Sequence, residues 1–253
     1  MVKIKPENIQ VGLAKVRFLK NPIEWIKIQK YKHDHKVLHN NNSLFYTTSP
    51  MALEAIMLAI DIQKQKGMFG DKYAYWEFGV FKGYSLWFAD LYAKHKEVDF
   101  NFYAFDSFEG LPESKVDCDK PSFNKGHYKS SFDFVFDKLT ELDANLDKIS
   151  FFKGFYSKKF FDNVTDFNHL QPISICAIDV DLYESAVPVL EFIKDYLVPG
   201  SIILFDDWNV FWGSDDHSER KALREFRDKY SNIKFQHLYN YGWHGTAWEV
   251  TEI

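Results

Sequence analysis

The sequence is poor in the residues that mark special classes of protein. Its 253 residues include only 2 cysteines, 8 prolines and 12 glycines. Cys118 lies in a polar stretch and Cys176 in an apolar run, and neither belongs to a CxxC pair, which argues against a disulfide and a zinc site. The low glycine and proline content argues against disorder. The length fits one large α/β domain or two small ones.

Long apolar runs and an excess of basic residues are also missing. No run reaches the roughly 18–20 residues that a membrane span needs, and no signal-peptide core follows the N-terminal Met-Val-Lys-Ile-Lys. We therefore expect a cytoplasmic protein with no membrane partner. The formal net charge is −5, whereas a nucleic-acid interface needs a concentrated basic face. Nucleic acid is therefore not an expected partner.

The hydrophobic pattern changes near residue 70. Residues 1–70 are mostly helical in pattern, and one helix begins at Ser49-Pro50, with Ser as N-cap, and stops near Gly67. We predict that residues 1–70 form an N-terminal helical extension that caps the substrate site. Residues 71–253 are predicted to form the main domain.

From residue 73 onward, short apolar runs alternate with amphipathic stretches. Near-continuous apolar runs are typical of strands buried on both faces of a parallel sheet. The order predicts an α/β fold, a doubly wound and mostly parallel seven-stranded sheet with an antiparallel C-terminal hairpin. The long stretch 107–130 is predicted to be a lid-like insertion. The expected strands are 73–79, 100–105, 149–153, 173–179, 201–205, 233–239 and 246–250, and the expected helices are 84–94, 131–142, 186–196 and 218–230.

Acidic residues follow the predicted parallel strands. In open parallel sheets, ligands bind outside the carboxyl ends of the strands, so these side chains should converge on one cleft. Each alone could be a helix cap or a solvated loop carboxylate, but together they would repel one another unless a cation or donors were bound. The residues are Glu77 after the first strand, Asp106 after the second, Asp179 and Asp181 after the fourth, and Asp206 and Asp207 after the fifth.

The first strand runs into the turn Glu77-Phe78-Gly79-Val80-Phe81-Lys82-Gly83. A glycine here lets a cofactor approach the backbone and the following helix N-terminus. The turn is not G-x-G-x-x-G, which speaks against a pyrophosphate-containing cofactor. Asp106 could accept hydrogen bonds from both ribose hydroxyls of an adenosyl group, or it could simply initiate a turn before Ser107.

The pairs Asp179-Val180-Asp181 and Asp206-Asp207 suggest a site for a hard metal such as Mg²⁺, which prefers carboxylate oxygens. No His/Cys spacing typical of Zn²⁺ is present. Four aromatic residues near the expected cleft could stack on a ligand or belong to the core, namely Trp208, Phe211, Trp212 and Trp243. Three histidines are expected to be structural, namely His127, His217 and His244.

Four segments resemble one enzyme family. Residues 105–113, Phe-Asp-Ser-Phe-Glu-Gly-Leu-Pro-Glu, are similar to the FDSFEGLPE signature of the macrocin-type sugar O-methyltransferases. Residues 77–83 resemble the family's EFGVYRG turn, 177–185 its IDADLYES segment, and 199–208 its PGGIIIFDDY segment. Order and spacing agree over about residues 73–230, although Tyr84 and Trp208 depart from the usual residues.

The resemblance implies a class I, Rossmann-like methyltransferase that uses S-adenosylmethionine and Mg²⁺. By position, Asp179, Asp206 and Asp207 would hold the metal, and Asp181 would be the general base. The implied acceptor is a hydroxyl of a small molecule, most plausibly a sugar, and a homo-oligomer is left open. The implied cofactor-binding residues are Glu77, Gly79, Val80, Gly83, Ser85, Asp106, Ser107 and Asp179.

Three alternatives stay open at this point. A catechol-type O-methyltransferase would share the metal chemistry but would act on an aromatic diol. A methyltransferase-like binding protein would share the fold and lack the reaction, against which the intact carboxylates speak. An NAD-dependent oxidoreductase would need the glycines that the first turn lacks.

Overall fold

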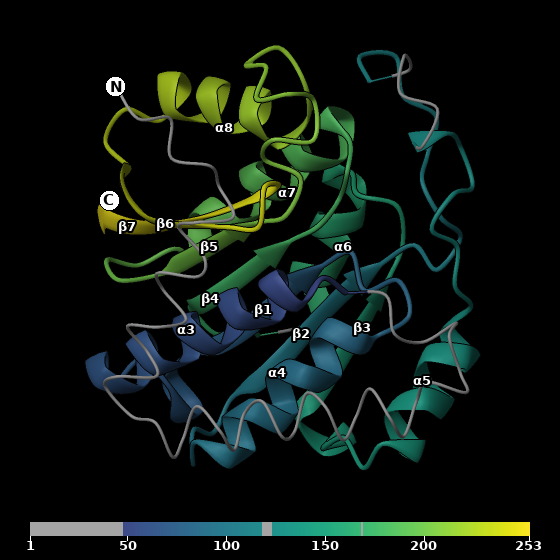
Figure 1. Ribbon diagram of the computed structural model, residues 1–253, viewed down its shortest axis with the longest axis vertical. Helices are drawn as coiled ribbons and strands as arrows, with labels where there is room; N and C mark the ends of the chain where they lie inside the picture. The colour runs from purple at the N-terminus through teal and green to yellow at the C-terminus, as the bar shows by residue number, and fades with distance from the viewer. Residues whose placement is uncertain (1–47, 118–122, 168) are drawn as a thin grey trace.

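The computed structural model describes residues 48–117, 123–167 and 169–253, and seven strands within them form one sheet in the order β3-β2-β1-β4-β5-β7-β6 (Figure 1). The first five strands in this order are parallel to one another, and β7 is antiparallel to both β5 and β6. The predicted fold class is thereby confirmed. The strands are β1 Ala74–Phe78, β2 Asn101–Asp106, β3 Ile149–Lys153, β4 Ile173–Ile178, β5 Ile202–Phe205, β6 Lys234–Tyr241 and β7 Gly245–Glu252.

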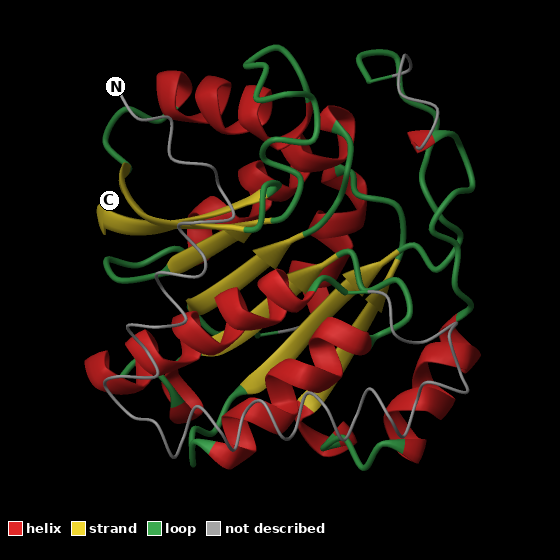
Figure 2. Ribbon diagram, viewed as in Figure 1, coloured by secondary structure: helices red, strands yellow, loops and turns green. Residues whose placement is uncertain are grey.

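The helices cover both faces of the sheet (Figure 2). One buried cluster joins the sheet to α3, α4 and α5, and a second joins its other face to α6, α7 and α8. The central strands β1 and β5 are buried along their whole length, as continuous apolar runs between two helical layers require. The helices are α3 Pro50–Lys66, α4 Tyr84–His95, α5 Phe132–Glu141, α6 Lys158–Phe167, α7 Tyr183–Ile193 and α8 Ser218–Lys229.

Local sequence explains where α3 and α6 begin. Ser49 caps α3 by accepting a hydrogen bond from the Met51 N–H, Pro50 occupies the first turn, and Gly67 ends the helix in a left-handed conformation. The pattern analysis missed α6, which has only 10 residues. The residue that marks the start of α6 in the sequence is Ser157, whose hydroxyl accepts a hydrogen bond from the Phe160 N–H.

Aromatic side chains fill the core between β1, β2 and α7. The rings of Phe78 and Phe105 stack with centroids 4.4 Å apart, and those of Phe161 and Phe192 with centroids 4.1 Å apart. Truncating such a buried ring to alanine costs about 3–5 kcal/mol of folding free energy. This packing makes a rigid platform beneath the carboxyl ends of the parallel strands.

The structure describes part of the predicted N-terminal extension. Residues 1–47 of the predicted extension and Cys118 lie outside the described residues. Within the described part, α3 packs against α4 in the first core cluster. No helix in that part is both long and apolar enough to cross a membrane.

Candidate active site

A cavity of about 630 Å³ opens at the carboxyl ends of the parallel strands. This volume lies within the range of small-molecule sites. Two of the predicted site residues, Glu77 and Gly83, do not line this cavity. The predicted residues that do line it are Gly79, Val80, Ser85, Asp106, Ser107, Asp179, Asp181, Asp206 and Asp207.

Gly79 is the tightest point of the first turn. Its φ is +87°, and a β-carbon added there would lie 1.7 Å from the Asp179 carbonyl oxygen. The Gly79 N–H donates to the Phe105 carbonyl at 3.0 Å and to the Tyr156 hydroxyl at 2.8 Å, and that hydroxyl donates to the Phe105 carbonyl at 2.8 Å. Only glycine fits both the dihedral and the space. Tyr156 lines the cavity and was not among the predicted residues.

Asp106 connects the turns that follow β1 and β2. Its Oδ2 accepts hydrogen bonds from the Val80 and Phe81 N–H groups at 2.7 and 2.9 Å, and its Oδ1 accepts one from the Phe108 N–H at 2.7 Å. Burial raises the pKa of Asp106, and these hydrogen bonds act in the opposite direction. Asp106 therefore initiates a turn as well as lining the cavity; its contact with a ribose stays a prediction.

Glu77 lies behind this turn. It is 1% exposed and accepts hydrogen bonds from the Ser85 and Tyr75 hydroxyls at 2.8 and 3.2 Å. Burial raises the pKa of Glu77 to about 8, although both hydrogen bonds lower it. Glu77 and Ser85 line a small adjoining void of about 30 Å³. Gly83 instead faces α5, because a β-carbon there would lie 2.9 Å from the Val135 Cγ1.

Three carboxylates meet in the cavity just after the ends of β4 and β5. Asp179, Asp181 and Asp207 each offer an oxygen, and these oxygens lie within 4.8 Å of one another. Asp181 has a φ of +60°, and its N–H donates to the Asp207 Oδ2 at 3.1 Å. The Asp207 N–H donates to the Oε2 of buried Glu219 at 3.0 Å, a partner that the sequence analysis did not foresee.

Asp206 is outside this group and faces the C-terminal hairpin. Its Oδ1 lies 3.5 Å from the His244 Nδ1, which is also 2.9 Å from the Asp206 carbonyl oxygen. Burial raises the pKa of Asp206, whereas His244 and the Tyr241 hydroxyl lower it. His244 therefore has a structural contact, as predicted, and also lines the cavity.

The electrostatics of this cluster favour a cation. Desolvation raises the pKa of Asp179 well above its usual value, although the residue is exposed at the cavity, and Asp206, Asp207 and Asp181 raise it further. Burial and Asp206 likewise raise the pKa of Asp207 to about 7. Among the described residues that line the cavity there is no lysine or arginine. The oxygen-only donor set fits Mg²⁺, which would relieve this repulsion.

Most of the four aromatic residues expected near the cleft do not line the cavity. Of the four candidates, Trp243 lines the cavity and is 60% exposed. Trp208 packs on Phe205 and Trp248, and Phe211 stacks on His217. Trp212 is 99% exposed. The other aromatic rings that line the cavity come from the connections between the main helices and strands, namely Phe81, Phe123, Tyr128, Phe155 and Tyr156.

The family model of macrocin-O-methyltransferase (TylF) matches residues 51–249. The chain belongs to this family. As a member of the macrocin-O-methyltransferase family, it is an S-adenosylmethionine-dependent O-methyltransferase. The resemblance noted in the sequence is thereby confirmed, and the oxidoreductase alternative is excluded. A search of proteins with curated functions found no match.

Solved structures agree with the macrocin-O-methyltransferase fold. The chain is similar to the O-methyltransferase NovP, with 19% identity, 79% of each chain covered and a TM-score of 0.65. It is similar to CalS11, a calicheamicin methyltransferase, with 18% identity, coverage of 98% and 94%, and a TM-score of 0.62. It is also similar to an O-methyltransferase from Bacillus cereus in complex with SAH, with 14% identity, coverage of 87% and 90%, and a TM-score of 0.55.

Proposed function

We propose that the protein transfers the methyl group of S-adenosylmethionine to a hydroxyl of a neutral sugar or glycoside, with Mg²⁺ bound beside that hydroxyl. The observation that carries this proposal is the meeting of the Gly79 turn and the carboxylates of Asp179, Asp181, Asp206 and Asp207 in one cavity. Membership of the macrocin-O-methyltransferase family supports the sugar.

The cofactor would occupy the side of the cavity formed by the turns after β1 and β2. Gly79, Val80 and Ser85 would hold its methionine end, with Glu77 behind them and Gly83 fixing the start of α4. Asp106 and Ser107 would contact the ribose, and Asp179 would lie between the cofactor and the metal. S-adenosylmethionine supplies an electrophilic methyl group, and the protein contributes mainly by positioning it.

Asp179 and Asp207 would hold the metal together with Asp206, which here lies outside their oxygen cluster and faces His244. Asp181, the third member of that cluster, would act as general base. Bound Mg²⁺ supplies positive charge that lowers the pKa of an acceptor hydroxyl. The Asp181 carboxylate belongs to the same oxygen cluster as Asp179 and Asp207, so it lies where a hydroxyl proton would be released. A base must reach that proton by a hydrogen bond.

The charge of the cavity favours an uncharged acceptor. Seven acidic residues line it, and its described lining includes no lysine or arginine. One divalent cation leaves the site negative, so a phosphorylated or nucleotide-linked sugar would be repelled. Phe81 and Tyr128, whose rings meet edge to face at 5.7 Å, offer an apolar wall. The acidic residues are Asp106, Glu113, Asp179, Asp181, Glu184, Asp206 and Asp207.

Two segments would close over the acceptor. Thr48 and Ser49 line the cavity from the part of the N-terminal extension just before α3, and 110–113 line it from the predicted lid. The lid is held together by the Leu111 N–H, which donates to the His127 carbonyl at 2.9 Å. We propose that residues 1–70 cap the acceptor side and that 107–130 form the lid over it.

Calorimetric titration with S-adenosylhomocysteine tests the cofactor site first. We expect micromolar binding that weakens in Asp106→Ala, and no binding by the folded protein would refute the proposal. Release of S-adenosylhomocysteine can then be compared for neutral glycosides, catechols and nucleotide sugars, with Mg²⁺ and with EDTA. Turnover only with a catechol or a nucleotide sugar would contradict the proposed acceptor.

A further inference from the structure

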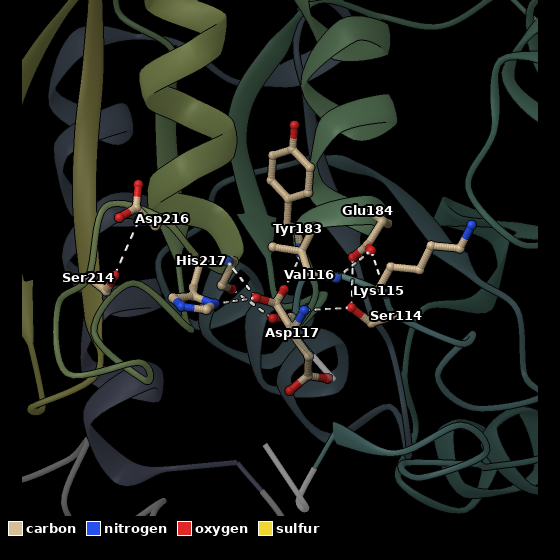
Figure 3. A network of polar contacts seen from close by, with 11 residues as sticks. Ser114, Lys115, Val116, Asp117, Tyr183, Glu184, Ser214, Asp216 and His217 are labelled. Atoms are coloured by element: carbon tan, nitrogen blue, oxygen red, sulfur yellow. Dashed lines mark hydrogen bonds and ion pairs between the residues drawn. The ribbon is translucent and has the colours of Figure 1, made fainter. Parts of the chain in front are cut away.

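Asp117 is a fully buried carboxylate outside the predicted site. It is 0% exposed, and its Oδ2 accepts a hydrogen bond from the Tyr183 N–H at 2.7 Å (Figure 3). Its Oδ1 accepts one from the Ser218 N–H at 3.3 Å and lies 3.1 Å from the His217 Nδ1. One side chain thus satisfies free N–H groups at the starts of both α7 and α8, where helix ends require partners.

The first turn of α8 also holds the backbone of the carboxylate cluster. The Ser218 hydroxyl donates to the Asp181 carbonyl at 2.7 Å, and Glu219 accepts a hydrogen bond from the Asp207 N–H at 3.0 Å. Both Asp181 and Ser218 have positive φ, at 60° and 47°. Such conformations persist only where surrounding contacts fix them.

The same carboxylate is tied to the preceding chain. The Asp117 N–H donates to the Ser114 hydroxyl at 2.8 Å. The Glu184 carboxylate accepts hydrogen bonds from the Ser114 hydroxyl and from the N–H groups of Lys115 and Val116, at 2.9, 2.7 and 3.0 Å (Figure 3). Two carboxylates therefore bind residues 114–117 to α7: Glu184 of α7 accepts hydrogen bonds from 114–116, and Asp117 accepts one from the first residue of α7.

We infer that Asp117 is a positioning residue that, through the first turn of α8, fixes the backbone of the metal ligand Asp207 and of the neighbouring base Asp181. It thereby couples the docking of residues 114–117 to the metal site. This inference rests on the metal site of the proposed function. Partners that orient metal ligands from outside typically contribute 10–100-fold to metal affinity. Asp117 contacts neither the metal ligands nor the cavity and acts through Ser218 and Tyr183.

The test is a titration of the full chain with Mn²⁺, followed by electron paramagnetic resonance with S-adenosylhomocysteine saturating. Asp117→Asn keeps the volume of the side chain, but its amide nitrogen must face an N–H donor in either orientation. We expect Asp117→Asn to weaken Mn²⁺ binding roughly 10–100-fold, with the affinity for S-adenosylhomocysteine unchanged. Ser218→Ala, a milder change, should weaken Mn²⁺ binding by a smaller factor.

Asp90→Asn is the matched control. Asp90 is also buried and also anchors a remote backbone N–H, that of Asn145 at 3.0 Å, but it lies outside the site. Its variant should bind Mn²⁺ like the parent protein. Equal Mn²⁺ affinity in the parent, Asp117→Asn and Ser218→Ala would overturn the inference about Asp117 and leave the proposed metal site standing. A parent protein that binds S-adenosylhomocysteine but no Mn²⁺ would overturn both the inference and the proposed metal site.

Discussion

Gly79 packs so closely on Asp179 that any β-carbon added to Gly79 would lie 1.7 Å from the Asp179 carbonyl oxygen. Gly79→Ala must therefore shift the backbone of β4 or of the turn itself. We expect a loss of about 1–3 kcal/mol in unfolding free energy, or more, and at least a tenfold loss in affinity for S-adenosylhomocysteine. Denaturant unfolding and calorimetry measure the two effects.

Gly67→Ala separates dihedral strain from the steric clash. Gly67 also has a positive φ, +70°, but nothing lies within 4 Å of an added β-carbon. Its alanine variant should lose about 1 kcal/mol and keep its affinity for S-adenosylhomocysteine. If both variants bound S-adenosylhomocysteine equally well, the close approach of Gly79 and Asp179 would have no role in the cofactor site.

Tyr156 should support the cofactor turn through its hydroxyl. Tyr156→Phe removes one of the two acceptors of the Gly79 N–H and also removes the hydroxyl that donates to the Phe105 carbonyl. We expect a loss of about 1–3 kcal/mol in stability and a several-fold loss of affinity for S-adenosylhomocysteine. Tyr230→Phe breaks a hydrogen bond to Glu191, far from the cavity, and should leave that affinity unchanged. Equal affinities in the two variants would contradict a role for Tyr156.

Asp181 and Asp206 should differ in function although both are close to the metal. Asp181→Asn should retain Mn²⁺ and S-adenosylhomocysteine binding and lose roughly 10²–10⁴-fold in kcat, the usual contribution of a general base. Asp206→Ala should abolish stimulation by Mg²⁺. Steady-state rates with an accepted glycoside, measured across a Mg²⁺ series, distinguish the two. Unchanged turnover in Asp181→Asn would remove it as the base.

The strand ends could be predicted from sequence because each combines two strong signals, a buried apolar run and the polar residue that follows it. Asp106, Asp179, Asp181, Asp206 and Asp207 were found in this way and line one cavity. Their partners could not be found, because they come from distant positions whose local sequence carries no such signal. Glu219 lies in a charged helix, and Tyr156 follows β3 in a short loop that holds two aromatic residues. Only the folded chain brings them beside Asp207 and Gly79.

The metal-free protein should become less stable as pH rises. Buried Asp207 has a pKa of about 7 and Glu77 one of about 8, whereas unfolded carboxyl groups titrate near 4. From about pH 4 to about pH 8 the folded protein therefore retains protons that the unfolded chain has released, and stability falls. Thermal melts across this range check the trend.

Mg²⁺ should weaken this dependence. The ion replaces the protons of the cluster, so it should raise the Tm more at pH 8 than at pH 5. Asp207→Asn should flatten the metal-free trend, because it removes one group with a raised pKa. A Tm that rises with pH in the metal-free parent protein would contradict this prediction. It would show that ionising the carboxyl groups does not destabilise the folded protein.

The reversed direction of β7 has a consequence for how acceptor choice can change among related proteins. The strand β7 is antiparallel to its neighbour β5. The turn that precedes β7 therefore opens at the same edge of the sheet as the loops that follow the parallel strands. Trp243 and His244 reach the cavity from this turn. Surface turns tolerate insertions and substitutions far better than the elements they connect. Evolution can therefore reshape this wall of the cavity by altering a few hairpin residues, while the glycine turn that would hold the cofactor stays untouched.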